Sequence, residues 1–267
     1  MSVSLTYIYL FPVGIIIAVL AISAGISGTN FWIPVYLIWL GIDAKTTFWL
    51  SLLTMIFGFG SGIIKNLKER TVNWYVVKDY LKIAVPSSIL GTLFIPFAPV
   101  KILLIIFAGF IFIYGGYLIY HYWLCYCGNG PAERKSTDRI CRERAALGGF
   151  LKGLIATGMG KLVMPCILRH KKIRSPAEAV GSTVLIIFVV NICALIFRLT
   201  PDFVSDLIVQ KDLIFEIMIW VAPGVFIGGQ IGPAIAQKLS VQGIKLYVGC
   251  LLMGVSVLIG LRAFGIC

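Results

Sequence analysis

Two glycine-rich breaks in otherwise apolar segments carry most of the polar donors that could bind a ligand. The first break and its following proline contain Gly25, Ser27, Gly28, Thr29, Asn30 and Pro34. The second break contains Gly158, Gly160, Lys161 and Pro165. A helix that restarts after such a break exposes unpaired N–H groups and the positive end of its dipole, and both attract anions. These residues therefore predict a site for a small anion.

Lys161 is predicted to be the one ionisable side chain deep in the apolar region. A lysine is costly in lipid and normally faces a cavity or a partner, which predicts that Lys161 adds a full positive charge to the site. Two alternatives stay open: the side chain reaches an interface, or the second break lies at a shallower depth.

Further candidate donors follow each break on the next apolar segment. They are Ser51 and Thr54 in the first half, and Ser182, Thr183 and Asn191 in the second. Ser51 and Ser182 occupy equivalent places, and Thr54 lies three residues beyond Ser51 on nearly the same helix face. The alternative for such residues is a hydrogen bond back to their own helix. The glycine runs 58–62 and 224–229 have a similar alternative, since small residues let membrane helices pack closely.

The sequence offers little for catalysis or for cofactor binding. Its Asp and Glu residues fall in loops or near segment ends, so no central carboxylate is available for a proton relay. No nucleotide-binding loop is present, His121 and His170 lie at segment edges, and the cysteine spacing matches no standard zinc site. We therefore expect no cofactor, no metal and no enzymatic activity. The alternative is a membrane redox or sulfur-relay protein that uses Cys166 and Cys193.

Composition predicts an all-α polytopic membrane protein. The 267 residues are 59% hydrophobic and 13% charged, and apolar runs long enough to cross a bilayer recur along the chain. The formal charge of +12 is explained by basic cytoplasmic loops that contact lipid headgroups. Residues 1–10 lack Lys and Arg, so we expect the first apolar segment to be retained. The expected partners are the bilayer and a small anion, and no nucleic acid.

The chain divides into two halves that resemble each other. The expected units are a first membrane repeat at 1–126, a hydrophilic linker at 127–146 and a second membrane repeat at 147–267. The apolar segments are 10–40, 46–64, 80–98, 101–124, 147–168, 178–198, 213–236 and 243–264. Three proline pairs align between the halves: Pro34 with Pro165, Pro86 with Pro223, and Pro96 with Pro233. An internal duplication follows from these pairs.

The first segment of each half poses a length problem. About 30 apolar residues make roughly 45 Å of helix, against a hydrocarbon core of about 30 Å. One solution is a single broken crossing, so that each half has four crossings. The other is a re-entrant hairpin followed by three transmembrane helices, which makes the halves inverted repeats with both termini outside.

The distribution of positive charge favours inverted repeats. With re-entrant hairpins, 17 Lys and Arg residues fall on one side and 5 on the other, against 14 and 8 with four crossings per half. Because short cytoplasmic loops carry the excess of Lys and Arg, the inverted arrangement is the clearer fit. It predicts that the basic loops 65–82, 134–152 and 169–174 are cytoplasmic and that the loop 200–212 lies outside, in a protein of the cell (inner) membrane.

As an ensemble, these motifs resemble the TauE/SafE family of sulfite and organosulfonate exporters. The stretch 25–37, with its glycines, Pro34 and Leu37, is similar to the first family hallmark, and Val72-Asn73-Trp74 after a basic turn to the second. The second half repeats the scheme through the second break, Pro165 and residues 178–183. The resemblance spans nearly the whole chain and implies export of a small sulfur-containing anion. This sequence departs from the family pattern at Lys161, which suggests a tighter electrostatic grip on the anion.

Overall fold

The computed structural model describes residues 5–23, 27–126, 140–236 and 241–264, and these residues form helices joined by short turns. The first half contains η1 (Leu5–Tyr7), α1 (Leu10–Ser23), α2 (Thr29–Pro34), the π-helical turn η2 (Val35–Trp39), α3 (Ala44–Lys68), α4 (Trp74–Leu93), η3 (Ile95–Phe97) and α5 (Val100–Tyr126). The second half contains α6 (Arg142–Ile155), α7 (Met159–Ile167), α8 (Pro176–Phe197), α9 (Pro201–Val209), α10 (Lys211–Ala236) and α11 (Val241–Ala263).

Local sequence signals set several helix starts. The side chains of Asp43, Asn73, Ser175 and Thr200 accept hydrogen bonds from the backbone N–H groups of the first turns of α3, α4, α8 and α9. Such caps satisfy one of the N–H groups that a helix start leaves unpaired. In α8 and α9 a proline follows the cap, where its missing N–H costs nothing.

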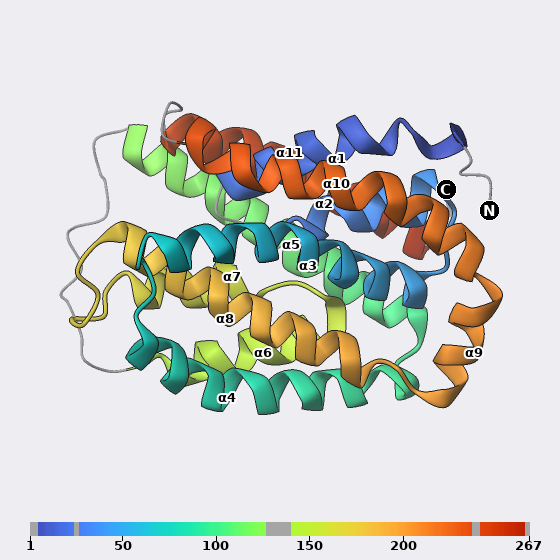
Figure 1. Cartoon of the computed structure of the whole chain (residues 1–267), viewed down its shortest axis with the longest axis horizontal. Coiled ribbons are helices and arrows are strands. Elements are labelled where there is room, and N and C mark those ends of the chain that lie inside the picture. Colours follow the sequence, from blue (N-terminus) through green and yellow to red (C-terminus); the bar gives the residue numbers. More distant parts are fainter. Residues whose placement is uncertain (1–4, 24–26, 127–139, 237–240, 265–267) are drawn as a thin grey trace.

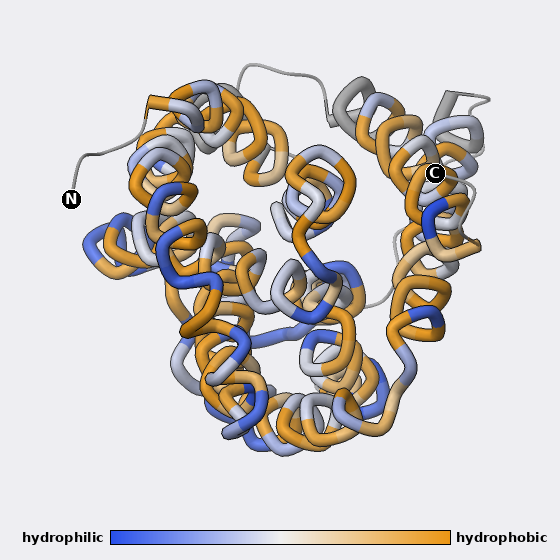
Figure 2. Tube along the Cα trace, turned by 90° about the vertical axis from the view of Figure 1, so that its right-hand side faces the viewer, coloured by the Kyte–Doolittle hydropathy of each residue, from blue (hydrophilic) through white to orange (hydrophobic). Residues whose placement is uncertain are grey.

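Seven helical stretches among the described residues are long and apolar enough to cross a bilayer: Leu5–Ile22, Ala44–Lys68, Trp74–Phe97, Val100–Tyr120, Pro176–Phe197, Lys211–Ile231 and Leu246–Ala263. Seen along the helices, most of the chain trace is hydrophobic (Figure 2). The chain is an integral, multi-pass membrane protein, as its composition predicts.

The most extensive helix pairings join the two halves. α1 packs against α10, α6 packs against α4, and α5 packs against α11 (Figure 1). Glycines permit the close approach: a Cβ on Gly228 of α10 would meet the backbone oxygen of Ile15, and a Cβ on Gly153 of α6 would meet that of Ser88. The prediction that the α10 glycines serve packing is confirmed at these contacts.

The structure differs from the sequence prediction in one connection. The expected loop 200–212 contains the short helix α9, whose Phe203 is buried and stacks edge-on against Trp49. Thr200 and Pro201 are a cap and first-turn pair of the kind that starts α8, so the local signal for this helix was present. Of the predicted linker 127–146, residues 127–139 lie outside the described part, and α6 already begins at Arg142.

Candidate functional site

The first break ends at Gly28, which precedes the first turn of α2. The Ser27 hydroxyl hydrogen-bonds the Thr29 hydroxyl at 2.8 Å, and Asn30 Nδ2 donates to the Ser27 carbonyl oxygen at 2.9 Å. All three polar side chains are buried. The polar groups of the first break therefore satisfy one another. Gly25, which the sequence also predicts for the site, lies outside the described residues.

The second break has a more unusual backbone. α6 ends at Ile155, the capping residue Ala156 after it has a left-handed conformation with φ of 59°, and Gly158 before α7 has a φ of 107°. A positive φ at Gly158 favours glycine over any residue with a Cβ. α7 then restarts and runs for nine residues with Lys161 in its first turn. The structure thus interrupts the helix at both predicted glycine clusters.

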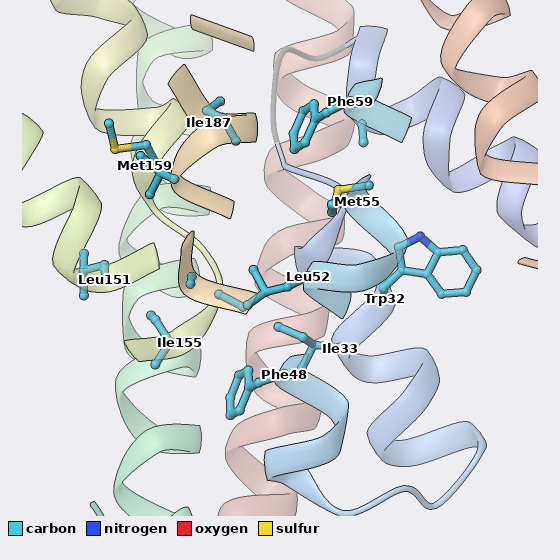
Figure 3. Packing of buried hydrophobic residues seen from close by; sticks show 14 of the residues in the cluster. Trp32, Ile33, Phe48, Leu52, Met55, Phe59, Leu151, Ile155, Met159 and Ile187 are labelled. Carbon is cyan, nitrogen blue, oxygen red and sulfur yellow. The ribbon is translucent and has the colours of Figure 1, made fainter. Parts of the chain in front are cut away.

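The two breaks are in direct contact. Thr157 Oγ1 donates to Asn30 Oδ1 at 2.6 Å, a contact between residues 127 positions apart. Apolar side chains surround both breaks, with Trp32, Ile33 and Met55 around the first and Leu151, Ile155 and Met159 around the second (Figure 3). The structure therefore brings the two predicted ligand elements together in the apolar interior.

Lys161 is buried without a hydrogen-bonding partner. Its side chain is 7% exposed, and its Nζ forms no hydrogen bond in the described part of the chain. The ammonium lies over two rings of α5, at 4.5 Å from the Tyr114 centroid and 5.1 Å from the Phe110 centroid. Aromatic faces partly compensate a cation, but they leave its N–H donors free. Lys161 can still donate hydrogen bonds to an anion.

Lys161 is not the one deeply placed cation, so that prediction was wrong. Lys152 is 1% exposed and Arg198 is 7% exposed. Both bind the carbonyl end of α6: Lys152 Nζ donates to Ala156 O at 3.0 Å, and Arg198 Nη2 donates to Gly153 O at 2.6 Å. Cations are favourable at this end of a helix because its dipole and its unpaired carbonyl oxygens are negative.

The three cations form one electrostatic cluster around the second break. Lys152 is close enough to Arg198 and Lys161 to be repelled by both. The buried polar and charged side chains of the described residues include these cations and His170, and no Asp or Glu. A buried charge costs several kcal/mol unless it is paired. Only part of this positive charge is compensated by carbonyl oxygens and aromatic rings.

The candidate donors on the helices after the breaks differ in their hydrogen-bond partners. Ser51 and Thr183 are buried and donate back to Phe48 O and Ala179 O of their own helices. Thr54 also donates back to its own helix, to Leu50 O at 2.9 Å, and in addition bonds the Tyr36 hydroxyl at 2.7 Å, which ties α3 to η2. Asn191 Nδ2 donates across the halves to Leu52 O at 2.8 Å, whereas its buried Oδ1 has no hydrogen-bond partner among the residues that the structure describes.

Ser182 lies in a link between the two halves rather than beside Lys161. Its Oγ accepts a hydrogen bond from the backbone N of Asn73 at 2.9 Å. Asn73 Nδ2 also donates to Glu178 Oε1 at 3.0 Å and to Lys172 O at 2.9 Å. The motif around Asn73 and the motif 178–183 thus meet where α4 and α8 begin, and this contact gives both a structural role.

The remaining predicted residues shape the breaks. Pro34 ends α2 at the transition to η2, and Pro165 lies inside α7. A Cβ on Gly28 would lie 2.9 Å from Met55 Cε, and one on Gly160 would lie 2.9 Å from Ile187 Cδ1. These glycines therefore let α3 and α8 approach the short helices closely.

The cysteines that the redox alternative would use contact other groups. The Cys166 thiol donates to Leu162 O and accepts from Arg144 Nη1 at 3.8 Å. Cys193 is half-buried on α8, and neither Cys166 nor Cys193 forms a disulfide with a described residue. No described contact joins the two cysteines, and the redox alternative is not favoured.

Four residues of this site were not among the sequence-based candidates: Tyr36, Lys152, Thr157 and Arg198. Thr157 lies inside the second break, so its position was a usable signal. Lys152 was assigned to a basic loop because charges precede it, although Leu151 and Leu154 beside it indicate a buried context. Arg198 follows directly on the apolar run of α8, and no local pattern distinguishes it from a residue at a membrane boundary.

Comparison with protein families identifies the family of the chain. Residues 10–259 match the family described as sulfite exporter TauE/SafE. The chain belongs to the TauE/SafE family. The match covers nearly the whole chain, including both breaks, and confirms the resemblance seen in its motifs. No curated protein and no solved structure matches the chain.

Proposed function

We propose that this TauE/SafE protein exports a small sulfur-containing anion, sulfite or an organosulfonate, and binds it where the two breaks meet. The observation that carries the proposal is the unpaired, buried ammonium of Lys161 in the first turn of α7. An anion there would receive a charge-assisted hydrogen bond and would face the positive end of a nine-residue helix. Family membership supports a sulfur oxyanion as the ligand.

The surrounding charge supports an anion rather than a cation or a neutral ligand. Three buried cations and no buried carboxylate, among the described residues, give this region a positive potential. The hydrogen bonds that Lys152 and Arg198 make to α6 leave Lys161 as the ammonium free to bind a ligand. A bound anion would offset the repulsion among the three cations.

We also propose that the halves are inverted repeats and that each begins with a re-entrant hairpin. Equivalent pairs of helices pack alike, since α1 meets α10 as α6 meets α4, and α3 meets α10 as α8 meets α4. α3 and α8 run in opposite directions where they cross, since Leu52 bonds Asn191 whereas Gly62 lies against Val184. A two-fold relation between halves of opposite orientation would produce both features.

Export of an anion needs no carboxylate relay. An inside-negative potential favours outward movement of negative charge by about 2.3 kcal/mol per charge for each 100 mV. Efflux down this gradient fits a chain whose described buried residues include no Asp or Glu.

Flux in proteoliposomes tests the function. The purified chain should release radiolabelled sulfite or sulfoacetate, faster with an inside-negative potassium diffusion potential and slower with the opposite one. Acetate serves as the control anion without sulfur. Absence of flux for every sulfur anion would contradict export. A flux rate that does not change with the membrane potential would contradict efflux driven by the electrical gradient.

A further inference from the structure

A pocket of about 200 Å³ opens at the end of α8, away from Lys161. Its lining includes Lys45, Thr92, Arg198, Thr200, Asp202 and Asp206. Lys45, Asp202 and Asp206 are exposed, whereas Arg198 is 93% buried and reaches toward the protein interior. The pocket therefore has a charged rim that faces solvent and a cation at its inner end.

Arg198 joins this pocket to the second break. One terminal nitrogen donates to Gly153 O and Leu154 O, next to the point where α6 ends. Thr92, which also lines the pocket, donates to the same Gly153 oxygen at 3.4 Å. The Arg198 Nε is buried and has no hydrogen-bond partner in the described part of the chain. The guanidinium thus retains donor capacity after it has bound α6.

A line of positive charge continues inward from the pocket. Lys152 and Arg198 both donate to carbonyl oxygens at the end of α6, Ala156 O and Gly153 O, and Lys161 lies in the first turn of α7 that follows. The charged residues of the pocket form no ion pair with one another, as far as the described residues extend. The pocket therefore lies on the same end of α6 that Lys152 binds, next to the break that contains Lys161.

We propose that this pocket is a second anion site, the vestibule through which the sulfur oxyanion exchanges with the aqueous phase at the α9 end. The ligand class is a small oxyanion whose oxygen atoms accept from Arg198 and from the Thr200 hydroxyl, because the Thr200 oxygen only accepts, from Phe203 N, and its proton is free. Lys45 at the rim offsets part of the repulsion that Asp202 and Asp206 exert on an anion. This inference rests on the proposed export of such an anion.

Side-specific flux distinguishes a vestibule from a residue of the central site. Sulfite uptake is measured in right-side-out and in inside-out membrane vesicles that contain the full chain, for Arg198→Gln, Arg198→Lys and the control Lys211→Gln. Lys211 is an exposed cation at the start of α10 that does not line the pocket. Detergent-extracted protein run on a sizing column verifies that each variant is folded.

We expect Arg198→Gln to raise the half-saturating sulfite concentration about tenfold when sulfite is presented at the α9 end, as for loss of a charged hydrogen bond. When sulfite is presented at the opposite end, the half-saturating concentration of Arg198→Gln should change less than about twofold. Arg198→Lys should recover part of the affinity, and Lys211→Gln should match the parent chain. Equal changes at both ends, or no change at either, would overturn the vestibule and leave the export proposal intact.

Radiolabelled sulfite binding to the purified chain is the second readout: if the parent chain neither binds nor transports sulfite, both proposals are overturned.

Discussion

The two breaks use the same backbone device but differ in charge. The first break contains Ser27, Thr29 and Asn30, whose polar groups bind one another and the Thr157 hydroxyl, and it contains no ionisable residue. The second break contains Lys161 without a hydrogen-bonding partner and has Lys152 and Arg198 beside it. The comparison favours a division of roles in the proposed site: the polar groups of the first break satisfy one another, and the second break supplies the positive charge for the anion.

The backbone conformations of the two breaks provide the largest predicted difference in stability. Gly158 has a φ of 107°, and a Cβ there would lie 3.0 Å from Leu151 Cβ. Gly28 has an ordinary helical φ of −63°, and its added Cβ would meet only the flexible end of Met55. Gly158→Ala should therefore cost about 2 kcal/mol, whereas Gly28→Ala should cost less than about 1 kcal/mol. Melting temperatures of the two purified variants measure which substitution costs more stability. Equal losses would contradict a difference in backbone strain between the two breaks.

The contact between the breaks should show as a coupling energy. Asn30→Leu leaves the Thr157 hydroxyl without its acceptor, and Thr157→Val leaves Asn30 Oδ1 without its donor. Once either partner is gone, the second substitution should cost less, so the double variant should be more stable than the sum of the singles by about 1 kcal/mol. Thermal unfolding of the four proteins in one detergent measures this term. Additive losses would mean that the breaks do not support each other.

The equivalent serines after the breaks provide the smallest difference. Ser182 accepts a hydrogen bond from Asn73 across the two halves, whereas Ser51 donates back to its own helix. Ser182→Ala should cost about 0.6 kcal/mol more than Ser51→Ala. The same melting assay applies, and a larger loss at Ser51 would contradict the assignment of Ser182 to the link between the halves.

Much of the fold follows from the sequence because membrane helices are specified by local hydrophobicity. Each predicted apolar segment corresponds to a helix or to a broken pair of helices, and the breaks fall where Gly28 and Gly158 stand. Family membership could likewise be predicted, because its motifs are contiguous runs such as the one around Asn73.

The composition of the site was less predictable because it depends on contacts between the halves. Nothing local indicates that Thr157 bonds Asn30, or that Arg198 binds the carbonyl end of α6. The sequence predicts Lys152 as the last residue of the basic loop 134–152, yet α6 begins at Arg142 and continues inward, so a residue ten positions later is buried. Sequence patterns locate segments, whereas packing between segments decides which cations are enclosed.

In the proposed function, the Lys161 ammonium binds the exported anion. The affinity of the purified full chain for sulfite tests this role of Lys161. Lys161→Met, of similar length and without charge, should weaken binding about tenfold or more, as expected for loss of a hydrogen bond from a charged group. Lys161→Arg should keep part of the affinity, and Lys101→Met, at an exposed cation on α5, should leave it unchanged. Unchanged sulfite affinity in a folded Lys161→Met protein would contradict the account.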